Sequence, residues 1–408
     1  MNLARFFLAC ARDVLKGGNQ YRLWITLLLI IAIIGAGAYY TQFQEGLIVT
    51  GMSDQVSWGV YIANFTFLVG LAAAAVMLVI PAYIFHQKEA HAVVLLAEGV
   101  AVAACIMCIL FVVVDLGRPD RFWHMIPGIG MFNWPKSLLA WDVIVLNGYL
   151  ALNITIPLYI LYTKYKGGTP NPRIYFPGVL ISIFWAISIH TVTAFLYSSM
   201  PARPFWNTAL LGPRFIASAF TAGPAFMVLA FRIIKAKTTY NINDPVIHYL
   251  ALVAGIALQI SLFMVGAELF TEFYAQTQHA ASAQFLFFGI DGFNSLVPFI
   301  WFGISIEIVA MVIFMVHRWR NNFMLLNIAC VFAIVGIWIE KGIGLVIPGF
   351  IPTPLGELFE YPVTLIETLV CLGIWAIGIL IFTLLAKTAI SIEQGQLKLK
   401  HNVSPRRI

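Results

Sequence analysis

Long apolar runs follow one another along almost the whole chain, separated by short polar or Gly/Pro-rich stretches. A helix needs about 20 mostly apolar residues to cross the hydrocarbon core of a bilayer, and most of these runs reach that length. The stretch 282–290 is apolar but too short to cross, so we expect a loop segment that lies at the surface or dips into it. The pattern predicts ten transmembrane helices, at residues 22–40, 58–85, 91–115, 137–163, 174–198, 213–235, 246–270, 294–317, 322–346 and 363–387.

The composition agrees with a membrane protein and excludes several other classes. Hydrophobic residues make up 61% of the 408 positions and charged residues only 10%, with a mean hydropathy of +0.89. A soluble domain carries about 25% charged residues, so a water-soluble enzyme is excluded, as are disordered, collagen-like and coiled-coil chains. We expect an all-α membrane protein in three parts: an amphipathic segment at 1–20, a ten-span domain at 21–388 and a basic cytoplasmic tail at 389–408.

The lysines and arginines predict the orientation of the spans, because cytoplasmic loops are enriched in these residues. With the N-terminus in the cytoplasm, ten crossings place 18 of the 24 basic residues on the inner side. The sequence therefore predicts a multi-pass protein of the cytoplasmic membrane with both termini inside. The outer side holds the other six: Arg118, Arg121, Lys136, Arg203, Arg214 and Lys341.

The first twenty residues combine basic and apolar side chains, among them Arg5, Arg12 and Lys16. This mixture predicts a short amphipathic helix on the inner membrane surface. A cleaved signal peptide is the alternative, but Arg12, Asp13 and Lys16 interrupt its apolar region. The amphipathic helix is therefore favoured.

The sequence offers few ligands for a redox metal. Cys105 and Cys108 form a C-x-x-C pair, but they lie inside a predicted span with no second pair, so we expect them to pack in the bundle. Haem with two histidine ligands needs two histidines that face each other, and of eight histidines only His190 lies well inside a span. We expect no haem and no iron–sulfur cluster in this chain, and no other metal site.

Ionisable residues inside the spans are the most informative feature, because a charge in the hydrocarbon core is costly unless it is paired or hydrated. Their crowding toward the outer side indicates a polar pocket that handles protons or a polar headgroup. The structural alternatives are a helix-end salt bridge of Asp115 with Arg118, a position of Glu340 and Lys341 in interfacial water, and an inter-helix hydrogen bond of His190. The outer group comprises Asp115, Asp142, His190, Glu268, Glu340, Lys341 and Glu367, whereas Glu98 and Glu307 lie deeper.

The segment 115–142, between the third and fourth predicted spans, combines the groups that a quinone site needs. Arginines supply positive charge, tryptophans supply flat apolar surfaces, and a histidine and an aspartate can exchange protons in a tuned environment. A quinone requires such walls for its ring and tail and polar groups at its two carbonyl oxygens. An aromatic belt with interfacial arginines is the alternative. The candidates are Arg118, Arg121, Trp123, His124, Trp141 and Asp142.

The same segment resembles a known family. The run DLGRPDRFWH at 115–124 is similar to the signature of the NrfD/PsrC family, the integral-membrane quinone-interacting subunits of modular redox complexes. Further similarities lie at 58–65 (WGVYIANF), at 268–274 (ELFTEFY) and between 348 and 387. The last stretch resembles the branch that contains the DsrP-type subunit of the sulfite-reduction-associated complex of sulfur-metabolising prokaryotes, and we place the chain nearest to that subunit.

The resemblance implies two four-helix bundles with flanking helices and no redox centre bound in this chain. It also implies a quinone site near the outer face, next to an iron–sulfur subunit. His124 and Asp142 match the positions that family members use at the quinone headgroup and are the catalytic candidates. Asp115, Arg118 and Arg121 match the surrounding motif, and Trp123 and Trp141 are pocket candidates. Candidates for a proton path are Glu98, His190, Glu268, Glu307 and Glu367.

We therefore expect a membrane subunit that oxidises a quinol or reduces a quinone and exchanges electrons with a ferredoxin-like iron–sulfur subunit. We take menaquinol as the expected quinol. Other membrane and cytochrome subunits are expected in the complex, and nucleic acid is not. Coupled proton movement is expected if Glu98 and Glu307 complete an inward path. Two alternatives stay open: a secondary transporter, although its usual inverted repeat with broken helices is not evident, and a purely structural membrane anchor.

Overall fold

The computed structural model describes residues 2–275 and 279–399, and every regular element in that part of the chain is a helix. Ten helical stretches are long and apolar enough to cross a membrane, which confirms the ten predicted spans to within a few residues at most ends. They are α2 (Asn19–Glu45), α3 to η2 (Val60–Ile84), α5 (Lys88–Asp115), α6 (Leu138–Tyr165), α7 (Pro172–Ser198), α8 (Leu211–Lys237), α9 (Asp244–Ala275), α11 (Val297–Met315), α13 to η6 (Phe323–Phe350) and α15 (Leu365–Glu393).

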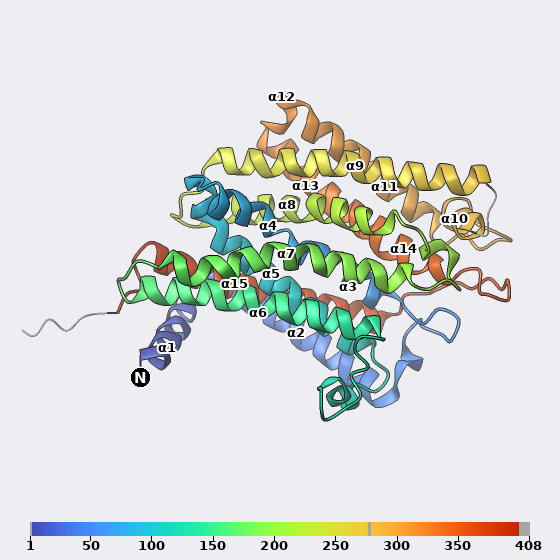
Figure 1. The fold of residues 1–408 in the computed structure, drawn as a ribbon, viewed down its shortest axis with the longest axis horizontal. Coiled ribbons are helices and arrows are strands. Elements are labelled where there is room, and N and C mark those ends of the chain that lie inside the picture. The colour runs from blue at the N-terminus through green and yellow to red at the C-terminus, as the bar shows by residue number, and fades with distance from the viewer. Residues whose placement is uncertain (1, 276–278, 400–408) are drawn as a thin grey trace, which may run out of the picture.

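The spans form two four-helix bundles, as the family resemblance implied (Figure 1). In the first bundle α3 packs on α5, α5 on α6, α6 on α7, and α7 again on α3. The second bundle closes in the same way through α8, α9, α11 and α13. The two bundles meet where α3 and α7 contact α8, and we call this contact the bundle junction.

Two helices flank the first bundle. Helix α15 packs against α5, and α2 packs against α15. Their crossing depends on small residues, because a Cβ atom added to Gly35 would lie 2.5 Å from the Cα atom of Gly373. Small residues allow such close approach of helices in membranes. The surface of α2 that does not contact α15 is mostly exposed and apolar, as in a helix that faces lipid.

Two spans are interrupted by short π-helical segments. In the second span, α3 (Val60–Ala73) and α4 (Val76–Val79) lead into η2 (Ile80–Ile84), where Pro81 cannot donate a backbone hydrogen bond. The ninth span continues from α13 (Phe323–Ile337) through η5 (Trp338–Ile343), α14 (Gly344–Val346) and the 3₁₀ turn η6 (Pro348–Phe350). Segment η5 packs against α3 and thus lies at the bundle junction.

The two ends of the bundles differ. One end, at the left of Figure 1, carries α1 (Asn2–Val14) and the end of α15. The opposite end carries the connections 46–59, 116–137, 199–210 and 351–364, and we call it the long-loop end. Phe6 of α1 is buried against Tyr165 and Ile392, so α1 is held to the ends of α6 and α15.

The expectation of a loop at 282–290 was wrong. Helix α10 (His279–Phe287) begins before it, and Ala283 and Phe285 are buried. It packs against α9, α11, η6 and the 3₁₀ turn η4 (Pro204–Trp206). The apolar run is too short to span but long enough to cover the long-loop end of the second bundle.

Candidate functional site

A polar core lies in the first bundle, near the long-loop end. Asp142, one turn inside α6, is 6% exposed, and the hydroxyl of Thr193 on α7 lies 2.7 Å from its Oδ1 atom. The same hydroxyl lies 2.8 Å from the carbonyl oxygen of Ile189. A hydroxyl has one proton to donate. The Thr193 hydroxyl can therefore donate to only one of these two oxygens at a time.

His190 lies one turn before Thr193 on the same face of α7 and is 1% exposed. Among the described residues neither of its ring nitrogens has a hydrogen-bond partner, so the inter-helix bond considered as an alternative is not formed. One turn after Thr193, Tyr197 shares a 2.5 Å hydrogen bond with Thr66 of α3. Side-chain polar groups therefore follow α7 along its buried face.

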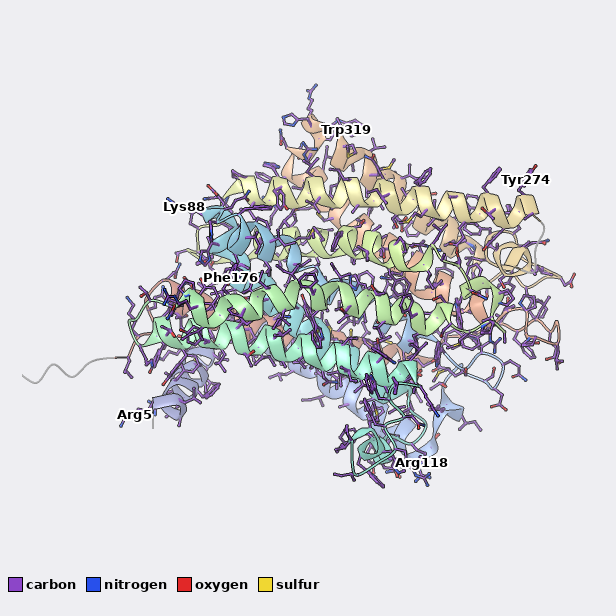
Figure 2. All side chains as sticks on the ribbon, viewed as in Figure 1. Arg5, Lys88, Arg118, Phe176, Tyr274 and Trp319 are labelled. Atoms are coloured by element: carbon purple, nitrogen blue, oxygen red, sulfur yellow. The ribbon has the colours of Figure 1, made fainter. Side chains whose placement is uncertain are left out.

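The loop motif lies outside this core. The 3₁₀ turn η3 (Pro119–Met125) carries Arg121, Trp123 and His124, all exposed, on a segment that projects from the bundle beside the labelled Arg118 (Figure 2). The ring of His124 lies against that of Trp123, with centroids 4.0 Å apart. The structure does not bring His124 to Asp142 by any hydrogen bond within its described part.

The predicted salt bridge between Asp115 and Arg118 is not formed. Arg118 instead pairs with Asp120, at 2.9 Å between Nη2 and Oδ2, and both side chains are exposed. The hydrogen bond and the charge of the guanidinium lower the pKa of Asp120. Trp141 on α6 donates from its indole N–H to the carbonyl oxygen of Pro135 at 2.8 Å, which ties the loop to the start of that helix.

A cavity of about 230 Å³ lies between the end of α2 and the segment that follows α5. Its polar floor is Gln42, which donates to the carbonyl oxygen of Val114 at 2.7 Å and accepts from the hydroxyl of Tyr61 at 2.6 Å. The ion pair of Arg118 with Asp120, aromatic side chains of α2 and the apolar residues of the two following segments form the rest. The lining residues are Tyr39, Gln42, Phe43, Gly46, Leu47 and 116–120.

Asp115 directly precedes Leu116, which is part of the cavity wall, but the Asp115 side chain is not itself one of the lining residues. The Oδ1 atom of Asp115 is buried, and no described residue forms a hydrogen bond with it. Tyr61 is close enough to interact with its charge. A buried carboxylate oxygen without a hydrogen bond lowers the stability of the protein. This oxygen is therefore available to accept a hydrogen bond or a proton.

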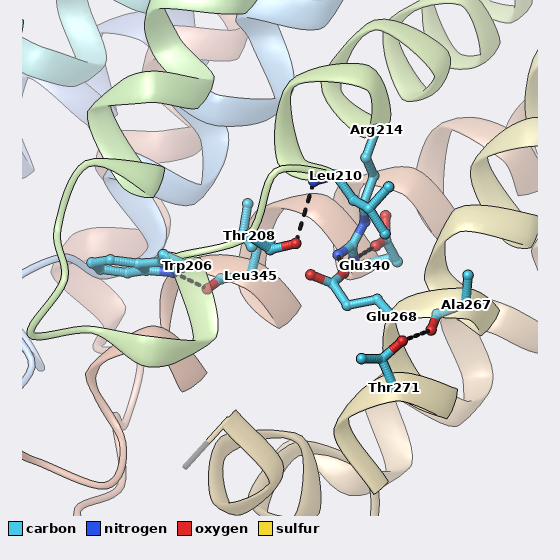
Figure 3. A network of polar contacts seen from close by, with 9 residues as sticks. All are labelled: Trp206, Thr208, Leu210, Arg214, Ala267, Glu268, Thr271, Glu340 and Leu345. Atoms are coloured by element: carbon cyan, nitrogen blue, oxygen red, sulfur yellow. Dashed lines mark hydrogen bonds and ion pairs between the residues drawn. The ribbon is translucent and has the colours of Figure 1, made fainter. Parts of the chain in front are cut away.

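A second polar cluster lies in the second bundle (Figure 3). Arg214 of α8 forms ion pairs with Glu268 of α9 and with Glu340 of η5. Beside it is a cavity of about 20 Å³, room for a single water molecule, which Glu272 also lines. Glu340 therefore pairs with Arg214, and because Glu340 and Lys341 are both buried, the position in interfacial water that we considered as an alternative is not observed.

Sequence reasoning counted Arg214 among the basic residues of the outer side, at the start of the span predicted at 213–235. It lies one turn inside α8 and is 8% exposed. Its position three residues into an apolar run was the available signal. The importance of Glu272 was also missed, although it follows Glu268 by one helical turn. Its Oε2 atom is buried without a hydrogen-bond partner in the described part of the chain.

The remaining candidates separate into two kinds. Glu98 on α5 and Glu307 on α11 are buried, each with one carboxylate oxygen unpartnered among the described residues, but they belong to different bundles. Glu367, in contrast, is fully satisfied. It accepts hydrogen bonds from the backbone N–H groups of Gly51 and Thr364 at 2.9 Å, and from the hydroxyl of Tyr361. With Thr364 it forms the capping box of α15.

No group of three or more His, Cys, Asp or Glu side chains within residues 2–275 and 279–399 is arranged to hold a metal ion. Cys105 and Cys108 are buried free thiols. The thiol of Cys108 faces the carbonyl oxygen of Phe65 at 3.9 Å. Both cysteines pack in the first bundle, as we expected.

Comparison with known proteins agrees with this architecture. Residues 48–352 match the family described as "Polysulphide reductase, NrfD". The sequence is similar to a subunit of selenate reductase from Mesobacillus selenatarsenatis, with 23% identity over 89% of this sequence and 92% of that protein. It is also similar to an Hdr-like menaquinol oxidoreductase integral membrane subunit of Archaeoglobus fulgidus, with 26% identity over 89% and 91%. One of the polysulfide reductase proteins of Wolinella succinogenes is 24% identical over 48% of this sequence and 64% of its own.

Proposed function

This chain belongs to the NrfD polysulphide reductase family of membrane proteins, and we propose that it binds menaquinol or menaquinone at the long-loop end of the first bundle. A partner subunit with iron–sulfur clusters takes electrons from the quinol or returns them. The similar protein of Archaeoglobus fulgidus, named a menaquinol oxidoreductase subunit, supports the choice of quinone. The finer placement beside DsrP-type subunits stays a prediction from the sequence.

The observation that carries the proposal is the cavity between the end of α2 and the segment 116–120, which follows Asp115 in the sequence. A cavity of about 150 Å³ is enough to hold benzene, so 230 Å³ accommodates a quinone ring. Helix α2, which forms one wall, faces the lipid, so the isoprenoid tail can remain in the bilayer while the ring enters. Gln42 and Arg118 provide hydrogen-bond donors for the two carbonyl oxygens.

Asp115 and Asp142 have the chemistry to take up the protons that leave a quinol on oxidation. Both lie near the long-loop end of the first bundle: Asp142 is buried, and Asp115 is half-buried with its Oδ1 atom buried. Arg121, Trp123 and His124 lie on the exposed η3 segment. In our proposal the iron–sulfur partner covers this segment and completes the pocket with His124. Trp141 holds the covered loop to α6.

The orientation predicted from the basic residues belongs to the proposal, with the long-loop end outside the cytoplasm. The buried positions of Arg214 and Lys341 support it, because these two of the six basic residues counted on the outer side do not lie in loops. Proton movement is proposed as well, but Glu98 and Glu307 do not share one bundle. A path inward through Glu98 of the first bundle would therefore be separate from any path through Glu307.

The test is a fluorescence-quench titration of the purified membrane complex with a quinol-analogue inhibitor. We expect saturable binding that Asp115→Asn, Asp142→Asn and His124→Ala each weaken tenfold or more, which corresponds to about 1.4 kcal/mol. Asp291→Asn is the matched control, because Asp291 is an exposed acid in a turn at the same end. It should bind the inhibitor like the wild type.

Two results would contradict the proposal. Tight binding that none of the three substitutions changes would move the quinone site elsewhere in the complex. The absence of saturable binding would favour a secondary transporter or a structural anchor.

A further inference from the structure

Lys341 is a lysine buried inside the membrane domain with no acidic partner. Its side chain is 2% exposed, and no carboxylate oxygen of the described residues lies within 4.0 Å of its Nζ atom. Its single hydrogen bond, to the carbonyl oxygen of Phe215, measures 3.4 Å. The Nζ atom also lies 4.0 Å from the centre of the Phe215 ring. An ammonium group has three N–H donors, so two of them find no strong acceptor here.

The π-helical segment η5 separates Lys341 from its neighbour in sequence. Glu340 extends into the second bundle, where it pairs with Arg214. Lys341 faces α3 and α8 at the bundle junction, since a Cβ atom on Gly70 of α3 would lie 3.4 Å from its Nζ atom. Isolated π-helical turns within α-helices are frequent at functional sites. Here the turn directs Glu340 into the second bundle and Lys341 to the junction between the two bundles.

Charge balance links these two residues. One guanidinium, Arg214, is shared by the carboxylates of Glu268 and Glu340, so the ionised trio carries a formal charge of −1. An excess charge is costly in the hydrocarbon core. Arg214 and Lys341 are the two buried basic side chains of the described Lys and Arg residues. A proton on Lys341 would bring the group to neutrality, and a proton on one of the carboxylates would do the same.

Further polar groups lie on both sides of Lys341 and the Arg214 cluster. On the side of the second bundle, the Oε2 atom of Glu340 is unpartnered in the described part of the chain, and the small cavity beside Arg214 reaches the cover formed by α10. On the side of the first bundle, His190 interacts electrostatically with Lys341. Neither of its ring nitrogens has a hydrogen-bond partner among the described residues. The titratable and charged groups that interact electrostatically with Lys341 are Glu340, Arg214 of α8, Cys108 of α5 and His190 of α7.

We propose that Lys341 is a proton-binding site at the bundle junction, which transfers protons between the quinone side of the first bundle and the acidic cluster of Arg214, Glu268 and Glu340. The inference rests on the proposed quinone function. Oxidation of a quinol gives two electrons to the iron–sulfur partner and two protons to the protein. A proton from the first bundle converts the amine of Lys341 to ammonium, and its transfer to a cluster carboxylate restores the amine.

The experiment uses the purified complex in liposomes that contain a trapped pH-indicator dye. The electron donor is 2,3-dimethyl-1,4-naphthoquinol and the acceptor is ferricyanide. Lys341→Met removes the proton site, and Lys341→Arg keeps the charge on a group that does not release its proton in proteins. Lys237→Met, at an exposed lysine of α8, is the control.

We expect both Lys341 variants to bind the quinol-analogue inhibitor within twofold of the wild type and to lose at least half of the protons moved per electron. Lys237→Met should match the wild type in both. Unchanged proton movement in Lys341→Met would overturn the inference. A wild-type complex that transfers electrons but moves no protons through the membrane would overturn it as well.

A second measurement needs no quinone and therefore separates this inference from the proposed function. The thermal unfolding midpoint of the detergent-solubilised complex is followed from pH 6 to pH 9 for the wild type and Lys341→Met. If Lys341 exchanges its proton, the difference between the two midpoints will change by several degrees over this range. Parallel curves would show that it does not, whatever the outcome of the quinone titration.

Discussion

Replacing Asn64 by leucine is expected to destabilise the chain by about 1–3 kcal/mol. Asn64 lies in α3 and is 2% exposed. Its Oδ1 atom accepts hydrogen bonds from two indole N–H groups, that of Trp338 in η5 at 3.1 Å and that of Trp375 in α15 at 2.9 Å. One side chain thereby joins the first bundle, the second bundle and a flanking helix.

The magnitude follows from the number of inter-helix bonds. Such bonds in a membrane protein contribute about 0.6 kcal/mol on average and about 1.7 kcal/mol at most. Both indole bonds are lost in Asn64→Leu, together with the 3.6 Å contact of Nδ2 with the Sγ atom of Cys371 in α15, and the two half-buried indole donors lose their acceptor. The third bond of Asn64, from Nδ2 to the carbonyl oxygen of Val60 at 2.8 Å, is within its own helix and adds little. Leucine has nearly the same shape, so no large cavity is created.

The assay is equilibrium unfolding in mixed micelles of increasing SDS content. Asn147→Leu is the matched control, since Asn147 also bonds to a carbonyl oxygen one turn back, Val143 at 2.9 Å, but is exposed on α6. It should change stability by less than about 0.5 kcal/mol. If Asn64→Leu is no less stable than Asn147→Leu, the two indole bonds do not hold the bundles together. A coupling of zero between Asn64→Leu and Trp375→Phe in a double-mutant cycle would lead to the same conclusion.

Gly349→Ala should destabilise the chain by about 1–3 kcal/mol, because the new Cβ atom would lie 1.9 Å from the buried ring of Trp206, whereas Gly37→Ala meets nothing within 4 Å. Unfolding in SDS micelles measures both. Burial raises the pKa of the Cys10 thiol from 9.0 to about 11, so maleimide labelling at pH 7.5 should be about a hundredfold slower than for an unperturbed cysteine. Labelling should rise as the pH approaches 11. Glu367→Gln should cost about 1–3 kcal/mol of stability, by weakening a cap, and leave the protons moved per electron unchanged.

Each of these has a result that would contradict it. Equal stability of the two glycine variants would show that the 3₁₀ turn η6 shifts freely away from the indole ring. Fast labelling of Cys10 at neutral pH would mean that α1 is not docked on the bundle. A loss of proton movement in a fully folded Glu367→Gln complex would show that Glu367 takes part in proton transfer. The burial of Tyr361 and its contact with Glu367, which raise the pKa of the phenol, argue for the structural role.

Local sequence was enough to predict the number of spans, their limits and the family. Each of these properties depends on local chemistry: about 20 apolar residues in a row are long enough to cross the bilayer, and polar residues end the run. The amphipathic pattern of α1 and the cap of α15 are equally local. The motif at 115–124 could be read for the same reason, because its residues are adjacent in the chain.

Which ionisable groups meet depends on the packing of the helices in three dimensions. Arg214 pairs with two acids that follow it by 54 and 126 residues, and it does so because α8, α9 and η5 enclose one space. Sequence spacing suggested a nearer partner in one case, Arg118 for Asp115, and that pair is not formed. Helical periodicity places a residue on a face of its own helix. The partner on the opposite helix depends on how spans far apart in sequence pack together, and no local pattern contains that information.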